Sequence, residues 1–186
     1  MQPPNMQFLF SGGDDAVEYG GAGSSDLPFG SLHRTQMLHL ASEINGAGPI
    51  TGIALQASAT TATGSYTYTL KLGHTALSEL TTSFAANYNA GMPSTLVSSG
   101  SFTIPAGVPA GEYIWIPFPG TFTYNGQDKL IVDMDVSGGT VLNAVRFTEG
   151  VGAGRMLGGA TGSDGTTMWT GTSMLNTKFR FNGGPL

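Results

Sequence analysis

The sequence predicts an all-β protein, an antiparallel, jelly-roll-like β-sandwich with long glycine-rich loops. Apolar and polar residues alternate along several short segments, glycine and proline separate those segments, and helical periodicity is hard to find. Hydrophobic residues make up 40% of the 186-residue chain, enough for the core of one domain. We expect a single sandwich over residues 27–186. Residues 1–26 are expected to be an N-terminal arm or first strand that packs on the sandwich or on a neighbour.

Strict alternation marks the clearest strands. In residues 66–72, tyrosine and leucine take one face while threonine and lysine take the other. Residues 129–136 repeat this pattern, with Asp133 and Asp135 expected on the solvent side. Further apolar runs complete the expected set of strands, at residues 50–58, 101–104, 113–118, 143–149 and 177–181.

Turn residues predict the connections between these strands. Asn125-Gly126 favours a tight turn, because both residues adopt positive φ readily. Residues 105–111 contain two prolines, which cannot donate to a strand ladder, and are expected to form a loop. Residues 150–154 and 158–167 predict a long glycine-rich excursion before the last strand. Residues 76–84 are the one segment expected to form a short helix.

Composition excludes several classes of protein. Charged residues are 10% of the chain, against about 25% in ordinary soluble proteins. The formal net charge of −5 argues against a nucleic-acid binder, and the absence of cysteine excludes disulfides and thiolate chemistry. No signal peptide is visible at the N-terminus, so we expect either a chain that is not exported by that route or one from which a leader has been removed. Phosphate-binding, dinucleotide-binding, nucleophile-elbow and zinc-protease motifs are missing, and no carboxylate pair is spaced for glycosidase chemistry. We expect neither an enzyme nor a cofactor.

Candidate metal ligands are few. Asp133 and Asp135 share one face of a strand and could supply two oxygens to calcium, or could be solvated charges that keep the sheet soluble. Residues 14–15, both aspartate, could ligate an ion or cap a turn. The histidines are expected to be surface residues or hydrogen-bonded structural residues rather than ligands; they are His33, His39 and His74.

Aromatic residues are the candidate contact residues. In residues 113–118 the isoleucines and Phe118 can fill the core, which leaves Tyr113 and Trp115 outward unless loops cover both sides of the strand. Outward aromatic rings stack on sugars or form the centre of a protein interface. The remaining candidates are Trp169 in the glycine-rich excursion, and Phe8 and Phe10 near the N-terminus.

Part of the chain resembles a known module. The similar stretches are residues 27–29 (LPF), 34–44 (RTQMLHLASEI), 50–55 (ITGIAL), 70–75 (LKLGHT) and 117–126 (PFPGTFTYNG). Over residues 27–136 they resemble a β-sandwich module repeated in secreted and cell-surface proteins of Bacteroidetes-type bacteria. The resemblance implies a jelly-roll-like fold and a non-catalytic role in adhesion, glycan contact or assembly, with no catalytic residues.

Two functional hypotheses follow from these observations. The first is a structural subunit that decorates or builds a virion, fibre or extracellular appendage, with copies of itself or other shell or surface subunits as partners. The alternative is a carbohydrate-binding or adhesin module of a secreted surface protein, in which Tyr113, Trp115 or Trp169 would stack on glycans. Both place the protein in a virion or at the cell surface, without nucleic-acid binding or membrane insertion.

Overall fold

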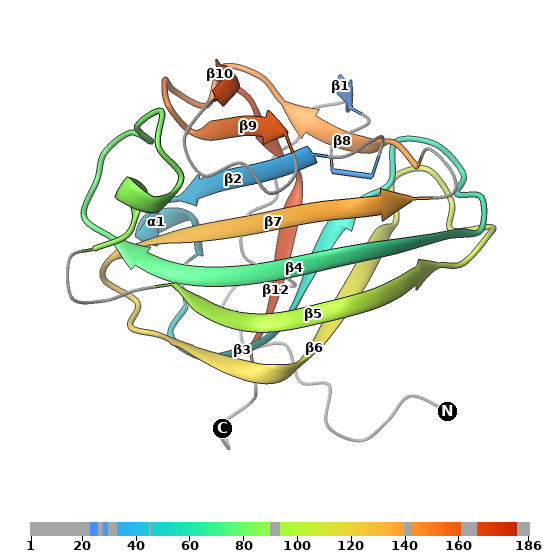
Figure 1. Ribbon diagram of the computed structural model, residues 1–186, viewed down its shortest axis with the longest axis horizontal. Helices are drawn as coiled ribbons and strands as arrows, with labels where there is room; N and C mark the ends of the chain where they lie inside the picture. The colour runs from blue at the N-terminus through green and yellow to red at the C-terminus, as the bar shows by residue number, and fades with distance from the viewer. Residues whose placement is uncertain are drawn as a thin grey trace.

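The computed structural model of the chain describes residues 23–25, 28–29, 33–44, 46–89, 94–139, 143–160 and 167–181. Antiparallel strands dominate these residues and pack face to face (Figure 1), which confirms the predicted all-β sandwich. The helices are single turns, α1 (Ala41–Ile44) and the 3-10 helix η1 (Ala85–Asn87). In the described part of the chain, no helix has the length and apolar character needed to cross a membrane.

Three sheets build the domain. The large sheet has the order β10 (Thr167–Gly171), β9 (Met156–Ala160), β2 (His33–His39), β7 (Lys129–Gly139), β4 (Gly64–Thr75) and β5 (Thr95–Ile104). The small sheet behind it in Figure 1 has the order β12 (Thr177–Phe181), β3 (Gly48–Gln56) and β6 (Tyr113–Tyr124). A side sheet has the order β1 (Gly23–Ser25), β8 (Val145–Thr148) and β11 (Met174–Leu175).

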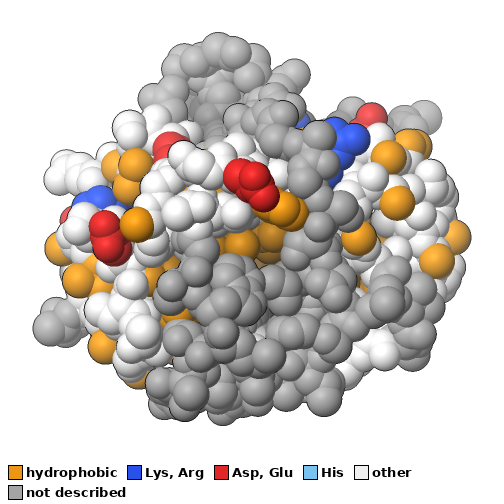
Figure 2. Space-filling model, turned by 90° about the horizontal axis from the view of Figure 1, so that it is seen from above, with side chains coloured by type: hydrophobic (Ala, Val, Ile, Leu, Met, Phe, Trp, Pro, Cys, Tyr) orange, Lys and Arg blue, Asp and Glu red, His pale blue; other side chains and the backbone are white. Residues whose placement is uncertain are grey.

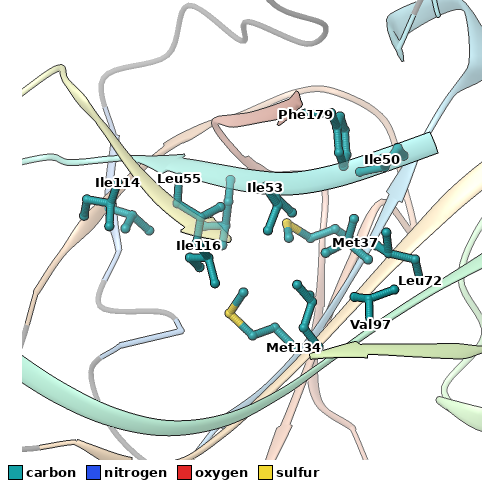
Figure 3. Packing of buried hydrophobic residues seen from close by; sticks show 14 of the residues in the cluster. Met37, Ile50, Ile53, Leu55, Leu72, Val97, Ile114, Ile116, Met134 and Phe179 are labelled. Carbon is teal, nitrogen blue, oxygen red and sulfur yellow. The ribbon is translucent and has the colours of Figure 1, made fainter. Parts of the chain in front are cut away.

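The main core lies between the large and small sheets. Figure 3 shows Ile53 and Leu55 of β3 and Ile114 of β6 directed into the same apolar space as Met134 of β7. Along β4 every second residue from Tyr66 to Leu72 is buried, as the alternating sequence predicts. Burial of these apolar faces supplies the main favourable contribution to folding.

Several predicted connections are confirmed. The Asn125-Gly126 turn joins β6 to β7, and Gly126 has a φ of 73°. The proline-containing loop over residues 105–111 joins β5 to β6. The expected strands are all present, some of them longer than the alternation indicated.

Two of the predicted segments differ from the structure. Residues 76–84 form an irregular loop in place of a helix, because the Asn87 side chain accepts hydrogen bonds from the backbone and the hydroxyl of Thr81 and so holds the chain in a non-helical path. The expected glycine-rich excursion contains strands β9 and β10. Within β9, Gly158 pairs with Thr35 of β2 on one side and Trp169 of β10 on the other, so tertiary pairing overrides the low strand propensity of glycine.

The loop over residues 76–89 covers part of the outer face of the large sheet. Leu80 and Phe84 from this loop form a second apolar cluster with Leu38 of β2, Ile131 of β7 and Leu157 of β9. The large sheet is therefore buried on both faces in this region.

His39 is fully buried on the core face of β2. Its ring meets that of Phe179 edge to face with 5.0 Å between centroids, and neither ring nitrogen has a hydrogen-bond partner. Desolvation, with the charge of Arg155, lowers the pKa of His39 to about 3. The expectation of a surface or hydrogen-bonded histidine is thus wrong for His39, because the strand places it between the sheets. It is confirmed for His74, whose Nε2 accepts the backbone N–H of Asn125 at 3.2 Å.

Protonation of His39 is expected to couple folding to pH. Because its pKa falls from 6.5 to about 3 on folding, the unfolded chain binds a proton in this window that the folded chain does not. The free energy of unfolding should be retained above pH 6.5 and fall as the pH drops towards 3, by up to about 1.4 kcal/mol per pH unit. Urea unfolding measured across this window tests the slope. The variant His39→Leu should lose much of this dependence of the free energy of unfolding on pH. If His39→Leu keeps the full slope, His39 does not couple folding to pH.

Candidate functional site

The candidate residues lie on two different surfaces of the sandwich. Asp133 and Asp135 belong to the outer face of the large sheet, whereas Tyr113 and Trp115 belong to the outer face of the small sheet. Trp169 lies on β10, at one edge of the large sheet, but its side chain is outside the described residues. Phe8, Phe10, Asp14 and Asp15 also lie outside the described residues.

Asp133 is the centre of a buried polar network. Its side chain is 2% exposed, so the expectation that it points to water is wrong. The Arg34 guanidinium donates to both carboxylate oxygens, with Nε–Oδ1 at 2.9 Å and Nη2–Oδ2 at 2.7 Å. Oδ2 also accepts hydrogen bonds from the Tyr88 hydroxyl at 2.7 Å and from Nε2 of Gln36 at 3.1 Å. The loop over residues 76–89 supplies Tyr88 and covers the Asp133 network on the outer face of the large sheet.

Further contacts tie this network to the covering loop. Gln36 donates to the backbone carbonyl of Phe84 and accepts a hydrogen bond from Nδ2 of Asn87. The Arg34 guanidinium lies 4.5 Å from the centre of the Phe84 ring. Burial and the negative charge of Asp133 raise the pKa of the Tyr88 hydroxyl, which keeps it protonated as a donor. The hydrogen bonds to Asp133 raise the pKa of Arg34.

Gly73 shows how closely this loop fits the sheet. A Cβ atom built at Gly73 would overlap the Tyr88 ring, so any side chain at this position would displace Tyr88. The missing side chain on β4 is therefore what allows the Tyr88 hydroxyl to reach Asp133 on the neighbouring strand β7.

This arrangement fits a structural ion pair better than a cation site. The Asp133 oxygens accept four hydrogen bonds from three side chains, and a calcium ion would have to replace these donors. Asp135 is half-buried further along β7. Among the described residues, no group of three or more His, Asp or Glu side chains is placed to hold a metal ion.

The second surface is made of two cations over two aromatic rings. Lys178 Nζ lies 4.2 Å from the centre of the Tyr113 ring, and Arg180 Cζ lies 4.2 Å from the centre of the Trp115 ring. We call these four residues the cation–aromatic face. Tyr113 and Trp115 are half-buried on this face, whereas Ile114 and Ile116 are buried in the core.

Small residues on the central strand make this face possible. Ala54 of β3 pairs with Lys178 of β12 on one side and with Trp115 of β6 on the other. A Cβ atom at Gly52 would already be in van der Waals contact with Arg180 and Trp115. Long side chains from the two flanking strands therefore meet above β3. The face can attract carboxylates through its cations and can contact apolar or sugar surfaces through its rings.

Lys178 and Arg180 were not among the residues expected from the sequence to make contacts. Their alternation with Thr177, Phe179 and Phe181 predicts that they share the outward face of one strand. Pattern alone does not show that this strand lies two positions from residues 113–118, because strand order is set by tertiary pairing. Searches of protein-family models, curated proteins and solved structures find no match for this chain.

Removing the Asp133 charge is expected to destabilise the protein strongly. In Asp133→Asn the buried Arg34 guanidinium loses its counter-charge, which should lower the free energy of unfolding by about 3 kcal/mol or more. The matched control is Asp135→Asn on the same strand and half-buried, for which we expect a loss below about 1 kcal/mol. Equilibrium unfolding in urea measures both. Similar losses in the two variants, or calcium stabilisation that only Asp133→Asn abolishes, would contradict a structural ion pair.

Proposed function

We propose that this protein is a non-enzymatic structural subunit that assembles with copies of itself through the edge strand β5. One observation supports this proposal most directly. β5 ends the large sheet and, in the part of the chain that the structure describes, pairs in a ladder only with β4. Its outer backbone groups are therefore placed to pair with a strand of another subunit.

The composition of β5 supports this role. Its ten residues, TLVSSGSFTI, include no charged residue and no proline, which are the usual devices that prevent edge-to-edge pairing. From residue 98 to residue 104 it pairs with β4 without a register shift. This run is long enough for a partner strand to pair along it.

The N-terminal end of β5 is less accessible to a partner strand. A register shift interrupts its pairing with β4 near Val97, and the backbone of Gly120 in β6 approaches Val97 closely. Leu96, beside this point, is 55% exposed and is the one large hydrophobic side chain that stands out among the described residues. Pairing along residues 98–104 would place a partner chain near Leu96, which would then lose exposed apolar surface.

The surface chemistry is consistent with an assembling subunit. Among the described residues of the face in Figure 2, charged side chains are few and set apart among uncharged ones. Only 10% of the residues are charged, so few charged side chains would lose water when copies associate. We propose that the assembled product is a virion component or an extracellular particle or filament, and that the sandwich has jelly-roll-like connections.

Assembly is expected to depend on the edge position of β5. Ser101→Lys together with Thr103→Lys should reduce the mass of the assembled species measured by light scattering, because lysines at an edge disfavour strand pairing. The matched control is Ser65→Lys with Thr67→Lys. These β4 residues pair directly with Thr103 and Ser101 and are also exposed, but β4 is an internal strand. A parent chain that is monomeric at every concentration, or equal effects of the two variants, would contradict the proposal.

Glycan binding is the second candidate function, and it is favoured by the placement of Tyr113 and Trp115 on one face of the small sheet. The cation over each ring leaves less ring surface for a sugar than a bare platform would. If this function holds, Trp115→Ala should abolish retardation of the protein in gels that contain polysaccharide, while Leu96→Ala should not. Unchanged retardation of Trp115→Ala, or none for the parent chain, would count against it.

A further inference from the structure

The edges of the three sheets differ in the length of strand that they offer to a partner. In the described part of the chain, the strands that end a sheet are β1, β11, β10, β12, β6 and β5. The first four have two to five residues each. β6 is long, but Pro117 and Pro119 interrupt it, and proline has no N–H to donate. Residues 98–104 of β5 are therefore the longest uninterrupted run at any of these edges.

The edge that matches β5 best is the same strand of a second copy. A ladder between two strands extends only as far as the shorter strand, so none of the other described edges can pair along all of residues 98–104. β5 also contains no charged residue and no proline, so two copies of it can meet without burying a charge or losing a backbone donor. Figure 1 shows β5 at the border of the large sheet, beside β4.

Symmetry restricts how two β5 strands can pair. A two-fold axis perpendicular to the sheet makes them antiparallel and keeps the inner faces of both copies on the same side. Paired residues of an antiparallel ladder also lie on the same side of the sheet. Along β5, Ser99, Ser101 and Thr103 are exposed, whereas Ser98 and Ile104 are buried. The axis must therefore pass through a residue pair, and only a register centred on Ser101 pairs all of residues 98–104.

This register brings together side chains of matching chemistry on the outer face. Ser101 lies opposite Ser101 of the second copy, and Ser99 lies opposite Thr103. These three side chains are exposed and end in hydroxyl groups. Serine and threonine hydroxyls that face each other across a strand pair can form hydrogen bonds, so the outer face stays polar and paired.

The inner face pairs an aromatic ring with a glycine. Phe102 of one copy lies opposite Gly100 of the other in this register. The Phe102 ring is half-buried, and its centroid lies 5.7 Å from that of Tyr68 and 5.8 Å from that of Phe29. A Cβ atom built at Gly100 would meet no atom within 4 Å, so the space beside this glycine is open. An aromatic ring across a strand pair covers the backbone of such a glycine.

We propose that β5 pairs with β5 of a second copy, antiparallel and centred on Ser101, so that the two large sheets become one continuous sheet. This inference rests on the proposed assembly through β5 and names the partner strand of that contact. A two-fold contact occupies both β5 edges and closes at two copies. A larger particle or filament then joins these dimers through another surface.

Single introduced cysteines test the register, because the chain has no cysteine of its own. Under mild oxidation, Ser101→Cys should become mostly disulfide-linked dimer. Residues directly opposite each other have Cβ atoms about 4.5–5.5 Å apart, close to the distance of about 3.5–4.5 Å in a disulfide. The matched control is Thr67→Cys, an exposed residue that pairs with Ser101 on the internal strand β4. Three strand spacings, about 14 Å, would separate it from its copy, so it should stay unlinked.

Mixtures of two variants distinguish the antiparallel register from other pairings. Ser99→Cys and Thr103→Cys should each link poorly to themselves, because four residues, about 14 Å along the strand, separate the two copies of each position. A mixture of the two variants should link across, and mass spectrometry of the disulfide peptides identifies the pair. Self-linking of all three β5 cysteines alike, or linking of Ser101→Cys no better than Thr67→Cys, would overturn the proposal.

Nitroxide spin labels on the same cysteines supply a measurement that does not need disulfide geometry. Dipolar broadening between two labels should be strongest for Ser101→Cys, weaker for Ser99→Cys and Thr103→Cys, and weaker again in each case when unlabelled parent chain is added in excess. Equal broadening at Ser101 and Thr67 would contradict pairing centred on Ser101.

Light scattering separates this inference from the proposed function. If the lysine variant of Ser101 and Thr103 loses assembly but Ser101→Cys neither links to itself nor shows label broadening, assembly through β5 stands and another strand is its partner. If the parent is monomeric at every concentration, both proposals are wrong. A smallest assembled species of dimer mass, with Ser101 linked to Ser101 in the cysteine variant, supports both.

Discussion

Burial of both faces of the large sheet, in the region that the loop over residues 76–89 covers, is the constraint on which the rest of this structure depends. The inner face packs on the small sheet, as apolar alternation requires. The outer face has to be covered as well, because β2, β7 and β9 also direct Leu38, Ile131 and Leu157 outward. Covering that face also buries Asp133, and the network with Arg34, Gln36 and Tyr88 supplies the partners that its charge needs.

The outer face of the small sheet is covered in a different way. There, long side chains cover the apolar surface. Lys178 and Arg180 lie across Tyr113 and Trp115, and the small residues Gly52 and Ala54 leave room beneath them. The same side chains bury apolar area and hold two positive charges on an acidic protein.

The predictions from sequence are right where a local residue pattern determines the structure. They are wrong where contacts with distant segments determine it. Residues 66–72 were predicted as a strand because period-two alternation identifies both the element and its buried face. Residues 76–84 were wrongly predicted as a helix, because their shape depends on Asn87 and on the sheet beneath them. His39 was expected at the surface or hydrogen-bonded, but it lies between the sheets, where Phe179 of β12 packs against it. For the candidate site, the sequence left open whether loops cover Tyr113 and Trp115, and it did not show the cations that lie over their rings.

The sequence by itself determined that this chain is an all-β sandwich, where most of its strands run, and which of their faces are apolar. These features follow from the alternation of side chains along a strand and from the preferences of glycine, asparagine and proline in turns. Only the tertiary structure decided that Asp133 is buried with Arg34, that Lys178 and Arg180 cover Tyr113 and Trp115, and that β5 lies at an edge. Each of these depends on which strands become neighbours, and strand order results from packing between residues far apart in the chain.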